Sequence, residues 1–278
     1  MTLAHDVAGS GPTVVLLHST VCDRRMWDPQ IPALVDAGHR VVRCDLRGFG
    51  QSPVPAGPYD DARDVTDLLD LLGVERAALV AASGGGRVAL EIAARRPRGV
   101  TSLALLCTAL AGHEPGAELR AFGAREDALI EAGDVAGATA LNVDTWLGPE
   151  ADGATREKVR RMQGHAFAVQ LAAAEREGSG GQEGKEEAAD GNGGGDGAGS
   201  RPAGTELSAI TAPVLLVSGR YDLPDFRAIA VRLADELPDA RHLELPWAGH
   251  LPSMERPDAV NALLVDFLRG PAAGQGAV

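Results

Sequence analysis

The chain has 278 residues, enough for one large α/β domain with an insertion or for two small domains. Its formal charge of -13 argues against nucleic acid and anionic membrane surfaces as partners. The three cysteines, Cys22, Cys44 and Cys107, are widely separated and match no metal-binding spacing. We therefore expect neither a disulfide framework nor a structural metal.

The N-terminal segment lacks a basic region followed by an apolar core, and no apolar run approaches the roughly 20 residues that span a bilayer. We expect a cytoplasmic protein that contacts no membrane. Nothing in the sequence suggests a metal or an organic cofactor. A monomer and a homodimer are both compatible with the sequence.

Strand-like and helix-like segments alternate from the N-terminus. The apolar run TVVLL at residues 13–17 is typical of a strand covered on both faces, as in a parallel sheet between helices. The alternation predicts a mostly parallel, doubly wound α/β sheet. We expect its strands near residues 2–8, 13–17, 40–44, 77–82, 100–107, 213–218 and 241–245.

The alternation stops near Gly112, and residues 114–177 contain helical patterns without a strand-like run. Ten of the 23 residues at 178–200 are glycine, which predicts a disordered linker. The resulting segments are a first core part at 1–111, a helical cap at 112–177, a Gly/Glu-rich linker at 178–204, a second core part at 205–270 and a flexible tail at 271–278.

The segment LVAASGGGRVAL, residues 79–90, reads as a strand, a sharp turn and a helix, with Ser83 at the turn. Ala81, Ser83 and Gly85 match the pattern of small residue, any residue, Ser, any residue, Gly, which places a nucleophilic serine on a strained backbone. The glycines could alternatively form an ordinary turn or a phosphate cradle. They complete neither glycine-rich phosphate motif, which disfavours the cradle.

Three polar residues are expected just past the carboxyl ends of strands, where open α/β sheets bind ligands: Ser83, Asp222 and His250. Their chain order is that of a Ser-Asp-His catalytic triad. His250 would act as general base toward the serine hydroxyl, and Asp222 would orient the imidazole. Taken singly, the aspartate could be a turn former and the histidine structural.

Five motifs in order resemble the α/β-hydrolase superfamily: LLHSTVCDRRMW, DLRGFGQS, LVAASGGGRVAL, PVLLVSGRYD and WAGHLPSMERP. The MWDPQ segment and the small helical cap are most similar to the 3-oxoadipate enol-lactonase subgroup. The resemblance implies an α/β-hydrolase fold whose cap follows the strand after the nucleophile turn. It also implies an oxyanion hole made by the backbone N–H groups of Thr20 and Gly84, although most relatives carry Gly at the position of Ser19.

We therefore expect a serine hydrolase that cleaves a small carboxylic ester or lactone through an acyl-enzyme. The alternatives are hydrolysis of a carbon-carbon bond in a diketone-type substrate and a non-hydrolytic, ligand-binding homologue. Arg24, Arg25 and Arg87 could pair with a substrate carboxylate or be surface charges. The candidate substrate contacts are His18, Ser19, Arg24, His113, Trp146 and His165.

Overall fold

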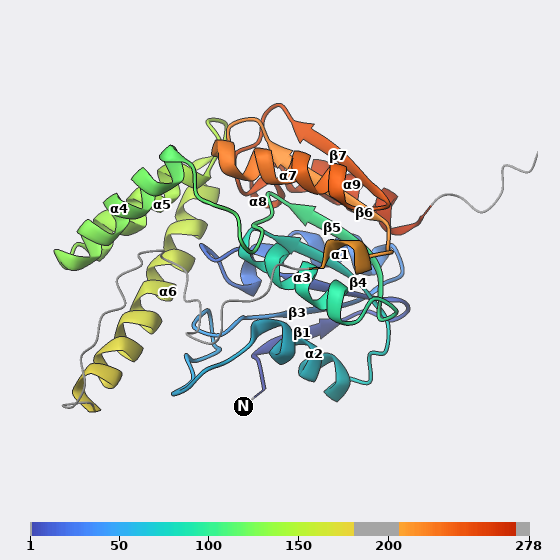
Figure 1. The fold of residues 1–278 in the computed structure, drawn as a ribbon, viewed down its shortest axis with the longest axis horizontal. Coiled ribbons are helices and arrows are strands. Elements are labelled where there is room, and N and C mark those ends of the chain that lie inside the picture. The colour runs from blue at the N-terminus through green and yellow to red at the C-terminus, as the bar shows by residue number, and fades with distance from the viewer. Residues whose placement is uncertain (1, 181–205, 271–278) are drawn as a thin grey trace, which may run out of the picture.

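The computed structural model describes the backbone of residues 2–180 and 206–270 and the side chains of residues 2–176 and 206–270. Within these ranges, seven strands form one sheet in the order β1-β3-β2-β4-β5-β6-β7 (Figure 1). Only the pairing of β1 with β3 is antiparallel, so the predicted mostly parallel sheet is confirmed. The strands are β1 (His5–Ala8), β2 (Thr13–Leu17), β3 (Arg40–Cys44), β4 (Ala77–Ala82), β5 (Val100–Leu106), β6 (Val214–Gly219) and β7 (Ala240–Leu245).

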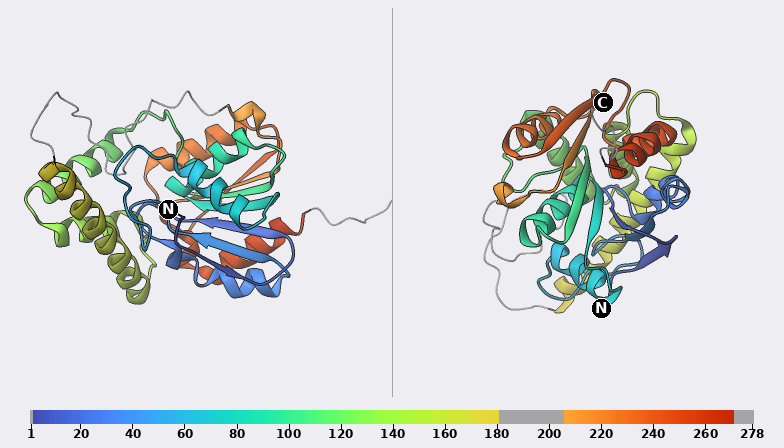
Figure 2. Two further views of the ribbon diagram at one scale, coloured as in Figure 1. Left: turned by 90° about the horizontal axis from the view of Figure 1, so that it is seen from below. Right: turned by 90° about the vertical axis from the view of Figure 1, so that its right-hand side faces the viewer.

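The sequence of β2 explains why both faces of the sheet are covered. Val15 and Leu17 belong to one buried core, and Val14 and Leu16 belong to another. Successive side chains of a strand point to opposite faces, so an uninterrupted apolar run needs a helical layer on each side. The helices α2 (Asp61–Leu71), α3 (Gly84–Arg95) and α7 (Pro224–Glu236) cover the first core, whereas α1 (Gln30–Asp36), α8 (Pro252–Glu255) and α9 (Pro257–Leu268) cover the second (Figure 2).

Three helices follow β5 and precede β6, and we refer to α4 (Ala117–Glu131), α5 (Val135–Trp146) and α6 (Gly153–Gly180) as the helical insertion. They lie together at one end of the sheet, on the left in Figure 1. α6 continues to Gly180, three residues into the predicted linker, because the helix-forming residues before Gly178 carry it past the first glycine. The rest of the predicted linker, 181–204, and the tail at 271–278 lie outside the described residues.

No helix in the described part of the chain combines the length and the apolar character that crossing a membrane requires. Cys22, Cys44 and Cys107 are buried, and their thiols are free. Burial raises the pKa of Cys44 to about 12 and raises that of Cys22 further. The thiols therefore remain protonated, and they behave as small apolar side chains.

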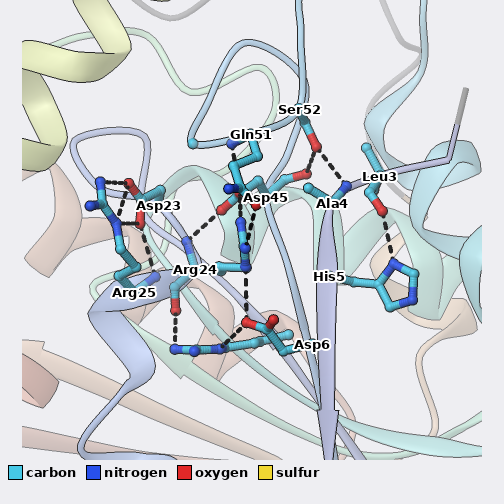
Figure 3. A network of polar contacts seen from close by, with 12 residues as sticks. Leu3, Ala4, His5, Asp6, Asp23, Arg24, Arg25, Asp45, Gln51 and Ser52 are labelled. Atoms are coloured by element: carbon cyan, nitrogen blue, oxygen red, sulfur yellow. Dashed lines mark hydrogen bonds and ion pairs between the residues drawn. The ribbon is translucent and has the colours of Figure 1, made fainter.

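The fully buried carboxylate of Asp45, at the end of β3, joins three segments that are distant in sequence (Figure 3). It accepts hydrogen bonds of 2.8 Å from the backbone N–H groups of Arg24 and Gln51, and it pairs with the Arg24 guanidinium. The Ser52 hydroxyl donates to the Asp45 carbonyl at 2.8 Å and accepts from the Ala4 N–H at 2.9 Å. The loop after β2, the loop after β3 and the N-terminal segment are thereby fixed to one another.

This network predicts a large loss of stability when the Asp45 carboxylate is removed. Asp45→Ala leaves two backbone donors and a guanidinium without their buried acceptor, so the free energy of unfolding should fall by about 3 kcal/mol. Urea unfolding measures the change. Asp70 pairs with Arg96 on the exposed surface, and Asp70→Asn is the matched control, with no measurable change expected. Equal losses in the two variants would contradict the conclusion that the Asp45 carboxylate holds these three segments together.

Candidate active site

Ser83 lies between β4 and α3 with a strained backbone, at φ 52° and ψ -121°. A positive φ is unfavourable for a residue with a side chain and persists only where the surroundings enforce it. Here the Ser83 N–H donates to the Leu106 carbonyl at 3.0 Å, and the Ser83 carbonyl accepts from Gly86 and Ala109. The sharp strand-to-helix turn predicted at this serine is therefore present.

The first turn of α3 packs closely against the end of β2 and the loop that follows it, which favours small residues after Ser83. A Cβ on Gly85 would lie 2.5 Å from the His18 carbonyl oxygen at the end of β2. A Cβ on Gly84 would lie 2.5 Å from the Thr20 methyl carbon. The Gly85 contact is with backbone atoms that cannot move aside, so only glycine fits there. The Gly84 contact is with the end of a side chain, which a methyl group at position 84 would have to displace.

Asp222 and His250 meet beside Ser83, although 28 residues separate them. Asp222 lies in the turn after β6, and His250 lies in the loop after β7. A 2.8 Å hydrogen bond joins His250 Nδ1 to Asp222 Oδ2, and the Leu223 N–H donates to Asp222 Oδ1 at 2.7 Å. With Nδ1 bonded to the carboxylate, Nε2 is the nitrogen that can exchange a proton.

The loop that carries His250 is held by the helical insertion and by Glu255. The His250 N–H donates to the Trp146 carbonyl at 2.9 Å, and the Trp146 and His250 rings pack with their centroids 4.6 Å apart. Glu255 accepts hydrogen bonds from three backbone N–H groups, those of Gly148, Gly249 and Leu251. Burial raises the pKa of Glu255, although these donors partly oppose the effect. One carboxyl group thus connects the insertion to the histidine loop.

Two unoccupied backbone donors lie next to Ser83. The N–H groups of Thr20 and Gly84 form no hydrogen bond to any described residue, and both residues line the same cavity as Ser83. The N–H of Gly84 is free because it belongs to the first turn of α3, where no preceding carbonyl is available. This pair of donors can stabilise a negative oxygen that forms near the serine.

His18 fixes the loop that carries Thr20. Its Nε2 accepts the Leu46 N–H at 2.9 Å, so Nδ1 bears the proton and donates to the Ser19 carbonyl at 2.8 Å. Burial lowers the pKa of His18, which keeps the imidazole neutral in this tautomer.

A cavity of about 280 Å³ opens at the carboxyl ends of the strands. Its wall contains Ser83 and His250 from the sheet side and residues of α4 and α5 from the insertion. The Ser83 hydroxyl forms no hydrogen bond to a described residue. In unliganded sites the contact between nucleophile and base is often long and tightens with substrate.

The cavity wall also carries ionisable groups that the triad does not use. Asp61 is mostly buried, and burial raises its pKa to about 6 despite the Arg87 guanidinium 3.7 Å away. Its Oδ1 has no hydrogen-bonding partner among the described residues. His113 forms a 2.9 Å contact with Asp225. Burial alone would raise the pKa of Asp225, but hydrogen bonds from Gly116 and His113 hold it below its usual value.

The structure separates the predicted site residues into two groups. Seven belong to the cavity or stand directly behind it: Thr20, Ser83, Gly84, His113, Trp146, Asp222 and His250. Four predicted substrate contacts are not in the cavity wall: His18, Ser19, Arg24 and His165. These four bind neighbouring loops instead.

Contacts within the protein explain why these residues do not line the cavity. Arg24 pairs with Asp6 and Asp45, and His165 on α6 contacts the Gly50 carbonyl at 2.8 Å. Ser19 is fully buried, and its N–H donates to the Met26 sulfur at 3.3 Å. Buried polar groups are generally hydrogen-bonded within the protein, and these groups already have such partners.

Sequence reasoning missed the cavity residues of α4. Leu119, Phe122, Gly123 and Glu126 all line the cavity, and their spacing of three, four and seven places them on one helix face. The signal was an acidic residue at an otherwise apolar spacing. Asp61 and Phe226 were missed too, because nothing in their local sequence distinguishes them from ordinary helix residues.

Cys107, Asp222 and His250 offer three potential metal ligands whose donor atoms lie within 4.8 Å of one another. Two of these atoms already bond to each other, and burial raises the pKa of the Cys107 thiol well above its usual value. A protonated thiol is a poor ligand. The arrangement thus fits a hydrogen-bonded His-Asp pair better than a metal site.

Comparison with known proteins places this geometry in a family. Residues 12–257 match the pattern of the alpha/beta hydrolase fold family. A protein of Variovorax paradoxus named as a carbamate hydrolase, RutD, is 34% identical over 279 residues, which covers 96% of each chain.

Solved structures agree with this placement. The enol-lactonase of Burkholderia xenovorans LB400 superimposes with a TM-score of 0.74 at 26% identity and covers 96% of both chains. A thermophilic esterase of Thermogutta terrifontis gives 0.72 at 27% identity, covering 96% of this chain and 93% of its own. The chain therefore belongs to the alpha/beta hydrolase fold family, whose similar members include hydrolases of several substrate classes.

Proposed function

We propose that this protein is a serine hydrolase that cleaves a small carboxylic ester or lactone through an acyl-enzyme intermediate. The observation that carries the proposal is the strained Ser83, which shares one cavity with the hydrogen-bonded His250–Asp222 pair. The helical insertion would act as the cap of this site, because α4 and α5 supply one wall of the cavity.

The first chemical step needs a base and an oxyanion site. His250 Nε2 takes the proton of Ser83 as the hydroxyl oxygen attacks the substrate carbonyl carbon. Asp222 holds the Nδ1 proton and stabilises the imidazolium that forms. The N–H groups of Thr20 and Gly84 stabilise the tetrahedral oxyanion, and one such donor typically lowers the activation free energy by about 3 kcal/mol.

Collapse of the tetrahedral intermediate breaks the bond to the leaving alkoxide, which takes its proton from His250. Water then enters, gives a proton to His250 and attacks the acyl carbon. The second intermediate releases the carboxylate and restores the serine hydroxyl. For a lactone, the acyl group and the leaving alcohol belong to one molecule, so a single hydroxy acid is released.

Carbamate hydrolysis is a second candidate, which the 34% identical relative favours. The same nucleophile and oxyanion donors would act on the carbamoyl carbon. Turnover of matched ester, lactone and carbamate substrates separates these possibilities, and a diketone in the same panel tests carbon-carbon bond hydrolysis.

The proposed nucleophile predicts a specific covalent adduct. A serine-reactive fluorophosphonate should add one label to the wild-type protein and none to Ser83→Ala, as measured by intact-mass spectrometry. Hydrolysis of an activated ester should fall on the order of 10³ to 10⁶-fold in this variant. Wild-type protein that takes up no label would favour a ligand-binding homologue, and a loss below about tenfold would rule out the serine mechanism.

The close packing of Gly84 on Thr20 predicts a double-mutant rescue. Gly84→Ala directs a methyl group at the Thr20 methyl carbon and should displace one oxyanion donor, lowering kcat about 10 to 100-fold. Thr20→Ser removes that carbon while keeping the backbone N–H and the hydroxyl.

The Thr20→Ser and Gly84→Ala double variant should therefore recover most of the lost kcat, a positive coupling that steady-state kinetics on one ester would reveal. Thr20→Ser alone serves as the control, with a change below about threefold expected. Additive losses in the double variant would show that the two side chains do not share this space.

A further inference from the structure

The helix α4 presents one charged side chain to the cavity. Leu119, Phe122 and Gly123 form an apolar stripe, and Glu126 continues it one turn further along the same face. Glu118, on the flank of α4 beside this stripe, is exposed to solvent. The carboxyl group of Glu126 thus faces the ligand space.

Glu126 has no cationic partner among the described residues. Its side chain is buried, with 5% of the residue exposed, and its Oε1 accepts a hydrogen bond from the Asn142 amide. Oε2 forms no hydrogen bond or ion pair with any described residue. Burial raises the pKa of Glu126, since an ionised carboxylate next to one neutral amide is poorly compensated.

The cations in the cavity wall are committed to other acids. Arg47 forms a 2.8 Å ion pair with Asp64, and Arg87 forms a 3.1 Å ion pair with Glu91. The third basic group, His113, contacts Asp225 as described above. None of these pairs includes Glu126, so the described part of the chain supplies no positive charge to it and a cationic ligand could.

Aromatic rings adjoin this carboxyl group. Asn142, which donates to Glu126, also accepts the indole N–H of Trp146 at 2.9 Å, and Phe122 packs edge-on against Trp146 at 4.8 Å. The chain is only 4% aromatic, and yet five of its aromatic side chains line this cavity: Phe49, Tyr59, Phe122, Trp146 and Phe226. Aromatic faces beside a carboxylate are the usual recognition site for an ammonium group.

From this juxtaposition of a buried, uncompensated carboxyl group and aromatic rings, we propose that Glu126 selects substrates that carry a cationic nitrogen, quaternary or protonated. The inference names the substrate class of the proposed hydrolase and rests on that function. The ammonium would pair with Glu126 and lie against Phe122 or Trp146, while the carbonyl carbon lies at Ser83. Esters with an uncharged group of the same shape would lack both interactions.

Two pairs of esters that differ only by nitrogen against carbon test the proposal. The acyl pair is 4-nitrophenyl 4-(trimethylammonio)butyrate with 4-nitrophenyl 5,5-dimethylhexanoate. The alcohol pair is acetylcholine with 3,3-dimethylbutyl acetate. In at least one pair the wild-type kcat/KM should favour the cationic ester about tenfold or more. A preference below about twofold in both pairs overturns the proposal.

Variants of α4 assign the preference to Glu126. Glu126→Gln keeps the shape and removes the charge, so the cation-to-neutral ratio should fall to near one. Glu126→Asp should retain part of the preference. Glu118→Gln removes the same charge from the exposed face of α4 and should keep the wild-type ratio. A preference that persists in Glu126→Gln overturns the role of Glu126 and points to Asp61.

A binding measurement separates this inference from the proposed catalysis. Tetramethylammonium chloride should raise the Tm of the wild type by about 2 °C or more over sodium chloride of equal concentration. The difference should vanish in Glu126→Gln and persist in Glu118→Gln. If no ester is hydrolysed and no fluorophosphonate adduct forms, the hydrolase proposal fails, and the Tm comparison alone then decides the cation site.

Discussion

The close approach of the first turn of α3 to the ends of β2 and β5 is the constraint on which the site depends. It requires glycine at position 85, where a Cβ would lie 2.5 Å from the His18 carbonyl oxygen, and at Gly84 it leaves only 2.5 Å between a Cβ and the Thr20 methyl carbon. The same approach holds Ser83 at a positive φ, through its hydrogen bonds to the backbone around Leu106. The positive φ of Ser83 and the absence of side chains at the glycines reduce stability locally, and the two apolar cores that cover the faces of the sheet offset this loss.

Hydrogen bonds from buried polar side chains hold each of the loops around Ser83 in place. A neutral His18 fixes the loop that carries Thr20, and Asp45 joins that loop to the next strand. On the other side, Glu255 and Trp146 hold the loop of His250. Donors that are already oriented need no reorganisation when charge develops on a substrate, which is how a fixed backbone N–H contributes to catalysis.

The sheet and the residues at its carboxyl edge could be predicted from the sequence, and the cavity wall could not. Apolar runs and glycines specify where strands end, and the structure brings Ser83 and His250 to one cavity, with Asp222 hydrogen-bonded to His250. Arg24 and His165 were assigned to substrate, but their partners come from distant segments, and a sequence does not reveal that Asp45 or the Gly50 carbonyl is nearer.

The core and the helical insertion contribute different kinds of residues to the site. The core supplies the proposed nucleophile Ser83, the proposed oxyanion donors of Thr20 and Gly84, and Asp222, all of them in segments that directly follow strands of the sheet. The insertion supplies a mostly apolar part of the cavity wall together with Glu126, and its Trp146 also packs on His250. Substitution of Trp146 should therefore alter selectivity and the rate of proton transfer together, because its indole ring borders the cavity and packs on His250, whereas α4 borders the cavity without contacting His250 through any described hydrogen bond or ring contact. In this arrangement the substrate class can change through the insertion while the reaction at Ser83 stays the same.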